Sequence, residues 1–294
     1  MKAYELIGNT PMYQLENTNI YIKLEKFNLG GSIKDRAVLK MIQTAMAENK
    51  ITKDTVLIEA TSGNTGIALA MIGAMFQIPV IIVMPETMSV ERRQLVKAYG
   101  AKLVLSEGKL GMNGAIAYME KEKQAHSNYR SLSQFDNAAN VQAHYETTAE
   151  EILRQVPDVD IFVAGIGTGG TFTGVAKRLK EVNPAIRTIA GEPKDSAVLS
   201  GLKPGPHKIQ GIGAGFIPSI LDQDLIDDIM MVTNEEALEE TKQFVRETGI
   251  LIGISSGANI ALAKRLADRN PDKKIVTVAP DGGEKYLSIL DFGE

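Results

Sequence analysis

The sequence predicts an α/β protein of two doubly wound lobes with a cleft between them. Short apolar runs rich in β-branched residues alternate with segments of helical spacing along its 294 residues. This alternation is typical of parallel sheets covered by helices. Two sets of such units, before and after about residue 145, favour two lobes over one. We expect a smaller, mobile N-terminal lobe over residues 35–142 and a larger lobe over residues 1–34 and 143–294.

The first half of the chain supplies the smaller lobe. A strand is predicted over residues 19–25, where polarity alternates, and it leads into the segment GGSIKDR (residues 30–36) and a helix over residues 37–46. The units that follow are strand 55–60, helix 67–74, strand 80–85, helix 89–99, strand 101–105 and helix 111–124. Apolar runs without polar alternation indicate strands that are buried on both faces.

The second half builds the larger lobe with longer loops. Its elements are helix 149–155, strand 160–164, helix 172–181, strand 186–192, helix 235–248, a helix after the segment 255–259 and strand 275–279. Thr233 or Asn234 is expected to cap helix 235–248. The interval 193–218 is dense in Gly and Pro, and its length indicates a functional loop.

Composition narrows the classes of function. The chain has 32 basic and 36 acidic residues, so it lacks the positive charge that nucleic acid would require of a partner. No apolar run approaches the roughly 18 residues of a membrane span, and the N-terminus lacks the features of a signal peptide, so we expect a cytoplasmic protein without a membrane partner.

The residue types that are rare or absent exclude further chemistry. The absence of cysteine excludes disulfides, thiolate metal sites and a cysteine nucleophile. The three histidines, His126, His144 and His207, are widely spaced and are expected to be packed or surface residues. The sequence therefore predicts no metal site and gives little support to a Ser-His-Asp triad.

Lys34 is the first candidate functional residue. The turn signals Asn28 and Gly30 precede it and helical spacing follows, which predicts that Lys34 lies on the first turn of a helix. The helix dipole disfavours a cation there, so Lys34 should lose its proton more easily than a free lysine. Schiff-base chemistry requires a neutral amine of this kind. A solvated surface lysine is the alternative that this segment alone leaves open.

The loop GIGTGGT (residues 165–171) is a candidate anion site. It lies between a predicted strand and a predicted helix, so its amides can converge on a phosphate at the helix N-terminus. It also matches the dinucleotide fingerprint G-x-G-x-x-G, and Glu192 stands at the distance that this fingerprint requires. The hydroxyls of Thr168 and Thr171 favour a terminal phosphate, whereas a pyrophosphate needs bare backbone. A turn without a ligand is the third interpretation.

A second polar loop, TSGNTG (residues 61–66), precedes a buried helix. Its hydroxyls and exposed amides suit a carboxylate, with ordinary helix capping as the alternative. The segment SSG (residues 255–257) is a weaker signal, because by itself such a segment is more often a helix cap than a ligand site. An activatable lysine, a terminal-phosphate loop and a carboxylate loop together describe a pyridoxal phosphate enzyme that acts on an amino acid.

The chain resembles the cysteine synthases (O-acetylserine sulfhydrylases) of the fold type II pyridoxal phosphate family. Motifs shared in order carry the resemblance: GSIKDR, TSGNTG, QFDNAAN, GIGTGGT, GPHKIQGIGAGFIP and GISSGAN. The similarity runs from LIGNTP at residue 6 to Ser288, which is nearly the whole chain. It implies the fold type II architecture, pyridoxal 5'-phosphate as cofactor and a homodimer.

The resemblance also implies roles for individual residues. Lys34 resembles the lysine that binds the cofactor covalently, Asn64 the asparagine that bonds the cofactor's 3'-oxygen, and Ser255 the serine at the pyridine nitrogen, with Ser256 as the alternative. The phosphate cup corresponds to Gly167, Thr168, Gly169, Gly170 and Thr171. The substrate-binding positions correspond to Thr61, Ser62, Thr65, Gln134 and Gly213.

The activity that the resemblance implies is β-replacement. O-acetyl-L-serine and sulfide would give L-cysteine through an α-aminoacrylate, with Lys34 as general base and the smaller lobe closing through residues 61–65. Leu29, Ala138 and Val141 stand where the family usually has proline, and these departures concern substrate preference more than cofactor binding. Serine acetyltransferase is a further partner that the resemblance suggests.

Three alternatives stay open at the level of sequence. One is a cystathionine β-synthase or cysteine lyase of the same fold with another thiol or water as nucleophile. The others are a dinucleotide-binding oxidoreductase and a catalytically silent binding protein. The sequence fixes neither the leaving group nor the nucleophile.

Overall fold

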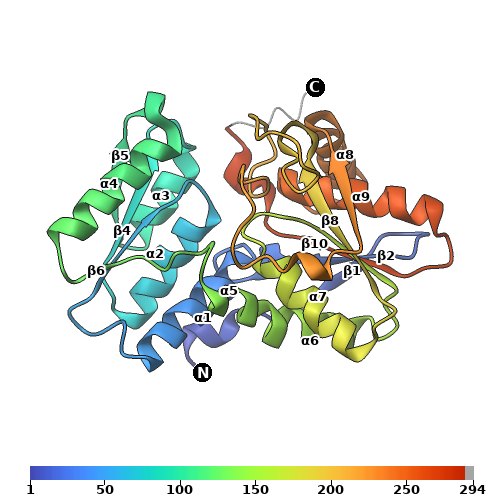
Figure 1. Ribbon diagram of the computed structural model, residues 1–294, viewed down its shortest axis with the longest axis horizontal. Coiled ribbons are helices and arrows are strands. Elements are labelled where there is room, and N and C mark those ends of the chain that lie inside the picture. Colours follow the sequence, from blue (N-terminus) through green and yellow to red (C-terminus); the bar gives the residue numbers. More distant parts are fainter. Residues whose placement is uncertain (289–294) are drawn as a thin grey trace.

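The computed structural model describes residues 1–288 and contains two sheets, each covered by helices (Figure 1). The larger sheet has β1 antiparallel to β2, while its other neighbouring strands pair in parallel. Its strands are, in spatial order, β1 (Met12–Gln14), β2 (Ile20–Leu24), β10 (Ile275–Ala279), β7 (Ile161–Gly165), β8 (Arg187–Pro193) and β9 (Asp228–Val232). Two mainly parallel sheets with covering helices confirm the predicted fold class.

The smaller sheet is parallel throughout. Its strands are, in spatial order, β5 (Lys102–Ser106), β4 (Val80–Pro85), β3 (Val56–Ala60) and β6 (Tyr129–Arg130). Its strands lie within the segment 35–142 that the sequence analysis assigns to a smaller lobe. The boundary of that lobe and its mobility stay predictions.

The helices follow the predicted order with small shifts at their ends. They are α1 (Lys34–Ala47), α2 (Asn64–Phe76), α3 (Val90–Ala98), α4 (Gly111–Ala125), α5 (Ala138–Ala143), α6 (Ala149–Gln155), α7 (Gly170–Val182), α8 (Asn234–Thr248) and α9 (Ile254–Arg269), with a π-helical segment His144–Thr148 between α5 and α6. Thr233 caps α8 in a reciprocal capping box with Glu236.

Several elements were not predicted. Strands β1 and β6 have three and two residues, which is too short for a period-two pattern to be recognised. Strand β9 and helix α5 were also missed. The helices also begin earlier than predicted at the three polar segments. Helices α2 and α7 begin inside their loops, at Asn64 and Gly170, and α9 begins at Ile254, directly before the segment 255–257.

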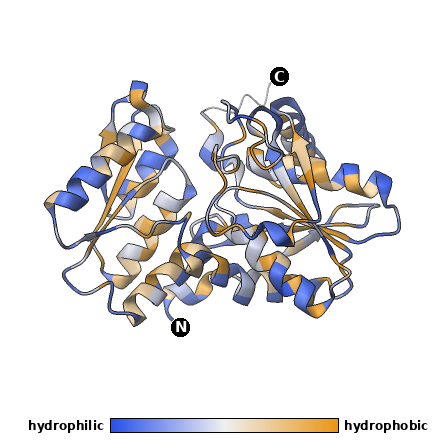
Figure 2. Cartoon of the chain, viewed as in Figure 1, coloured by the Kyte–Doolittle hydropathy of each residue, from blue (hydrophilic) through white to orange (hydrophobic). Residues whose placement is uncertain are grey.

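Hydrophobic packing explains why most of the predicted strands lack polar alternation. Figure 2 shows hydrophobic strands in both sheets and hydrophilic residues on the outward faces of the covering helices. Helix α2 is apolar nearly all round and its residues 65–73 are buried. Gly73 is required there, because a Cβ would lie 2.3 Å from Cγ2 of Val80. None of the helices in the described part of the chain is long and apolar enough to cross a membrane.

A buried ionic network fixes the start of α1. The Arg36 guanidinium donates from Nε to Glu25 Oε2 at 2.7 Å and from Nη1 to Glu151 Oε1 at 2.6 Å, and all three side chains are buried. Glu25 follows β2 and Glu151 lies on α6, so the network joins three elements. Burial by itself would raise the pKa of Glu151, but Arg36 and Lys23 outweigh it and lower that pKa to about 2.

Arg36→Ala should destabilise the protein by about 3–5 kcal/mol, because it removes the guanidinium from two buried carboxylates and leaves Glu151 with Lys23 alone. Urea unfolding of the cofactor-free protein measures the change. Arg178→Ala is the matched control, since Arg178 forms its ion pairs with Glu150 and Glu181 at the surface and should matter far less. Equal effects of the two substitutions would contradict the structural role of Arg36.

Candidate active site

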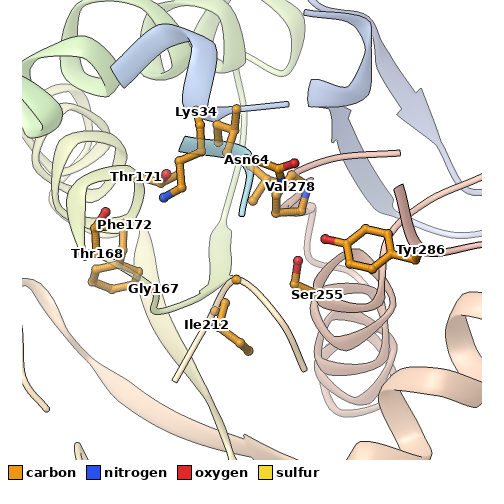
Figure 3. Close-up of a pocket in the computed structure, with 15 residues that line it drawn as sticks. Lys34, Asn64, Gly167, Thr168, Thr171, Phe172, Ile212, Ser255, Val278 and Tyr286 are labelled. Carbon is orange, nitrogen blue, oxygen red and sulfur yellow. The ribbon is translucent and has the colours of Figure 1, made fainter. Parts of the chain in front are cut away.

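A cavity lies at the carboxyl ends of β7 and β10, where residues from distant parts of the chain meet (Figure 3). It encloses about 560 Å³, part of which is open to solvent. All predicted cofactor-binding residues except Gly170 line it: Lys34, Asn64, Gly167, Thr168, Gly169, Thr171 and Ser255. Gly170 instead packs against Asn140, whose Oδ1 would lie 2.1 Å from a Cβ at residue 170.

Lys34 is the first residue of α1, as the sequence predicts, and lies next to the end of β10. The backbone N–H of Ile33 donates to Pro280 O at 2.8 Å, which ties the preceding turn to that strand end. In Figure 3 the Lys34 amine points toward the side of the cavity that holds Thr168 and Thr171. The residue is half-buried.

The pKa of Lys34 is lowered to about 8. Desolvation by burial is the main cause, and the negative charge of Asp281 partly opposes it. The sequence analysis predicted easier deprotonation of Lys34 from the helix dipole. The pKa of Lys34 is lowered as predicted, but burial is the main cause. Roughly a tenth of Lys34 amines are then neutral at pH 7, against about three in ten thousand for an ordinary lysine.

The loop 165–171 forms one wall of the cavity and ends in the first turn of α7. Gly169 adopts a left-handed conformation with φ of +86°, which a residue with a side chain rarely adopts. Thr168 Oγ1 accepts a hydrogen bond from Asn140 Nδ2 at 3.0 Å, so its own hydrogen can be donated elsewhere. Two threonine hydroxyls at a helix N-terminus form a site suited to an anion.

Glu192 does not act as the acidic partner of a dinucleotide. It is buried, and its carboxylate accepts hydrogen bonds from the backbone N–H groups of Leu199 at 2.9 Å and Ser200 at 3.0 Å. Its oxygens therefore stabilise the turn that follows β8. The glycine pattern of residues 165–170 thus lacks the ribose-binding carboxylate that a dinucleotide site would need.

Asn64 and Ser255 lie on the other side of the cavity, each in the first turn of its helix. Asn64 donates from Nδ2 to Asp281 Oδ2 at 2.7 Å. Ser255 is 3% exposed and its hydroxyl points into the cavity (Figure 3). Ser256 is fully buried, does not line the cavity and donates to the Asp281 carbonyl at 3.4 Å. Of the two serines, Ser255 is therefore the one that faces the site.

The predicted substrate-binding residues lie near the cavity but do not line it. Thr65 donates to Gln134 Oε1 at 2.7 Å, which brings two segments of the predicted carboxylate site together, while Thr61 and Ser62 precede the same helix end. Gly213 is turned away, with its carbonyl 2.9 Å from His207 Nε2, and Gly211 and Ile212 line the cavity in its place. The roles of these residues stay predictions.

Several residues that support the site were missed by sequence reasoning. Asn140 links the carbonyl of Gln134 to Thr168, and Asn259 accepts from Gly165 N while donating to Val278 O. Both end motifs that were recognised only as a whole, QFDNAAN and GISSGAN. Three more residues surround Asn64. Asp281 accepts hydrogen bonds from Asn64 and from the Tyr286 hydroxyl, and Lys285 donates to Asn64 Oδ1. Their only signal in the sequence was the segment PDGGEKY (residues 280–286).

His144 is a further supporting residue. It is buried, and its Nε2 lies 3.3 Å from the hydroxyl of Thr171. Burial and the positive charges of Arg36 and Lys34 hold the pKa of His144 well below its usual value. A neutral imidazole is therefore present behind the anion wall at physiological pH. No group of three or more histidine, aspartate or glutamate side chains within residues 1–288 is placed to hold a metal ion.

Comparisons with known proteins identify the family. The family described as "Pyridoxal-phosphate dependent enzyme" matches residues 3–281. The chain is 47% identical to cysteine synthase B of Campylobacter jejuni, over 98% of this chain and 97% of that protein. The chain belongs to the cysteine synthase family of pyridoxal-phosphate-dependent enzymes. Pyridoxal phosphate is its cofactor, and the dinucleotide alternative is excluded.

Solved structures of the family have the same fold. A cysteine synthase of Entamoeba histolytica superposes with a TM-score of 0.94 at 41% identity, covering 98% of this chain and 89% of that one. A hydrogen sulfide-producing enzyme of Fusobacterium nucleatum superposes with a TM-score of 0.93 at 47% identity, covering 97% of each chain. The resemblance stated from the sequence motifs is therefore confirmed.

The residues that line the cavity fit pyridoxal phosphate. An amine that is readily deprotonated suits the cofactor's aldehyde, and the helix N-terminus with Thr168 and Thr171 suits its phosphate. Asn64 and Ser255 are uncharged polar groups that suit the ring oxygen and the ring nitrogen. Each polar group of the cofactor therefore has a suitable partner among the residues that line the cavity.

The rate at which cofactor-free protein takes up pyridoxal phosphate should rise as the pH passes through about 8 and level off above it, because only the neutral Lys34 amine reacts. Stopped-flow recording of the visible absorbance measures this rate. Lys34→Ala serves as the background, and borohydride reduction with peptide mapping should label Lys34. A rate that still climbs at roughly pH 10, as for an ordinary lysine, would contradict the lowered pKa.

Proposed function

We propose that this protein is a cysteine synthase, which forms L-cysteine from O-acetyl-L-serine and sulfide by β-replacement. The observation that carries the proposal is the cavity in which Lys34, an anion wall and Ser255 face one another. The 47% identity to a cysteine synthase over nearly the full length of both chains supports the same reaction.

The proposal assigns the cofactor to residues in a loop and in the first turns of four helices. Lys34 forms the covalent link, the backbone and hydroxyls of residues 167–171 hold the phosphate, and Asn64 and Ser255 bond the ring. When bound, pyridoxal phosphate supplies an electron sink that allows the substrate to lose its α-proton and then its β-substituent. The Lys34 amine, once released, is placed to accept that proton, because it projects into the same cavity and is partly neutral at pH 7.

Residues 61–65 and Gln134 are proposed to bind the substrate carboxylate. The N-terminus of α2 presents backbone N–H groups there, and the bond between Thr65 and Gln134 holds the two segments together. Both segments lie in the predicted smaller lobe, whereas the phosphate wall lies in the larger one. Closing of the smaller lobe, residues 35–142, would bring the carboxylate site toward Lys34 and exclude water.

The assembly and location of the protein are proposed from family resemblance alone. We propose a cytoplasmic homodimer and serine acetyltransferase as a candidate partner. Sulfide is not the only nucleophile to test, because a hydrogen sulfide-producing enzyme of Fusobacterium nucleatum is also 47% identical to this chain. A cysteine lyase, or a cystathionine β-synthase with another thiol as nucleophile, is the second candidate function.

Product analysis separates these functions. Holoenzyme with O-acetyl-L-serine and sulfide should give L-cysteine with the highest kcat/KM among pairings of O-acetylserine, serine, phosphoserine or cysteine with sulfide, homocysteine or water. Amino-acid analysis and pyruvate detection measure the products. Sulfide release from cysteine as the fastest reaction would favour the lyase, and pyruvate as the main product at saturating sulfide would refute the synthase.

Ser255→Asp should lower kcat for cysteine formation by about tenfold or more while the cofactor still binds. An aspartate at the ring nitrogen would keep it protonated and make the ring a stronger sink, which favours a longer-lived carbanion over rapid loss of the β-substituent. Steady-state assays and the visible spectrum measure the two effects. Ser255→Ala, which adds no charge, is the matched control, and it should retain more turnover than Ser255→Asp.

A further inference from the structure

Lys285 is a buried lysine beside the cofactor site that the proposed function leaves unused. It is 7% exposed, it does not line the cavity, and it lies directly behind Asn64. Its ammonium donates to Asn64 Oδ1 at 3.0 Å, to Gly31 O at 2.9 Å and to Gly30 O at 3.3 Å. An ammonium has three hydrogens and no acceptor, so these three oxygens use all of them.

The neighbours of Asn64 fix the orientation of its amide. Lys285 can only donate and therefore requires the Asn64 oxygen, while the Asp281 carboxylate accepts and therefore requires the Asn64 nitrogen, 2.7 Å away. A flipped amide would place N–H against ammonium and C=O against carboxylate. Because Nδ2 carries two hydrogens and Asp281 takes one, the other remains for a ligand in the cavity (Figure 3).

The same ammonium fixes the turn that carries Lys34. Gly31 has a φ of +77°, and a Cβ there would lie 3.3 Å from Lys285 Nζ, so the absence of a side chain lets the ammonium approach the backbone. The turn continues through Ser32 and Ile33 into the first residue of α1, which is Lys34. Lys285 thus bonds both segments that approach neighbouring positions of the cofactor ring, the aldehyde carbon and the 3'-oxygen.

The charge of Lys285 adds a polarising effect. Within residues 1–288 no carboxylate lies within 4 Å of its nitrogen, so neutral carbonyl oxygens surround it. Burial lowers the pKa of Lys285, and the carboxylates of Asp281 and Asp35 oppose this. A cation at Oδ1 withdraws electron density from the amide and makes its N–H a stronger donor.

We propose that Lys285 is a positioning residue, which holds the amide of Asn64 and the turn before Lys34 in register with the cofactor's 3'-oxygen and aldehyde. This inference rests on the proposed contact between Asn64 and the cofactor, but not on which substrate the enzyme uses. Lys285 acts through Asn64 and the turn and does not touch the cofactor itself.

Titration of cofactor-free protein with pyridoxal phosphate, followed by visible absorbance, tests the proposal. Lys285→Met keeps the length of the side chain and removes its donors, so the Kd should rise about tenfold or more and the visible band should shift. Lys26→Met is the matched control, because Lys26 bonds Leu251 O and Glu284 of the same C-terminal region without contacting Asn64. It should bind the cofactor as the unaltered protein does. An unchanged Kd and band in Lys285→Met would overturn the proposal.

A double-mutant cycle tests whether Lys285 acts through Asn64. In the Asn64→Ala background, Lys285→Met should raise the Kd by a smaller factor than in the unaltered protein, and equal factors would overturn the coupling. If Asn64→Ala alone left cofactor binding unchanged, the contact of Asn64 and this inference would both fail. Failure of cysteine synthesis with the coupling intact would refute only the proposed reaction. If Lys285→Met does not fold, as judged by thermal unfolding, Lys285→Gln replaces it with a neutral amide.

Discussion

The buried ion pairs of Arg36 hold the start of α1, and the position of the reactive amine depends on them. Burial of a guanidinium is costly unless its N–H groups are satisfied, and those of Arg36 bond Glu25, Glu151, Thr10 and Thr147. Lys34 lies two residues earlier, roughly 200° away around the helix. Anchoring Arg36 on the side of β2 and α6 therefore directs Lys34 to the opposite side, where the cavity lies.

Three other helices begin at the same cavity, and their positive ends favour anions there. Asn64, Thr171 and Ser255 each lie in the first turn of a helix, so the positive ends of three helix dipoles meet there. Phosphate and carboxylate groups are stabilised in such a place, while an ammonium is not. The arrangement thus favours the ligands of the proposed reaction and the neutral form of Lys34 together.

The parts of the site that the sequence predicted are those whose signal is local. Lys34, Thr168, Thr171 and Ser255 stand where a glycine-containing loop meets a helix, and spacing along the chain reveals such positions. Asn64 is held by Asp281 and Lys285, which lie 217 and 221 residues away, and no rule of spacing connects residues so far apart. The burial that lowers the pKa of Lys34 arises in the same way, from packing between segments.

Helix α3, which packs on the smaller sheet, contacts the segment 281–286 that holds Asn64. Arg92 of α3 is buried with its guanidinium 4.7 Å above the ring of Tyr286, and it donates to Gln210 Oε1 at 2.8 Å. Within residues 1–288 its Nε has no hydrogen-bond partner, so burial of this charge is only partly compensated. If the smaller lobe moves as predicted, opening would cost the ring contact and return hydration to the guanidinium. These two effects oppose each other, so the loss of the ring contact on opening would be partly offset by hydration of the guanidinium.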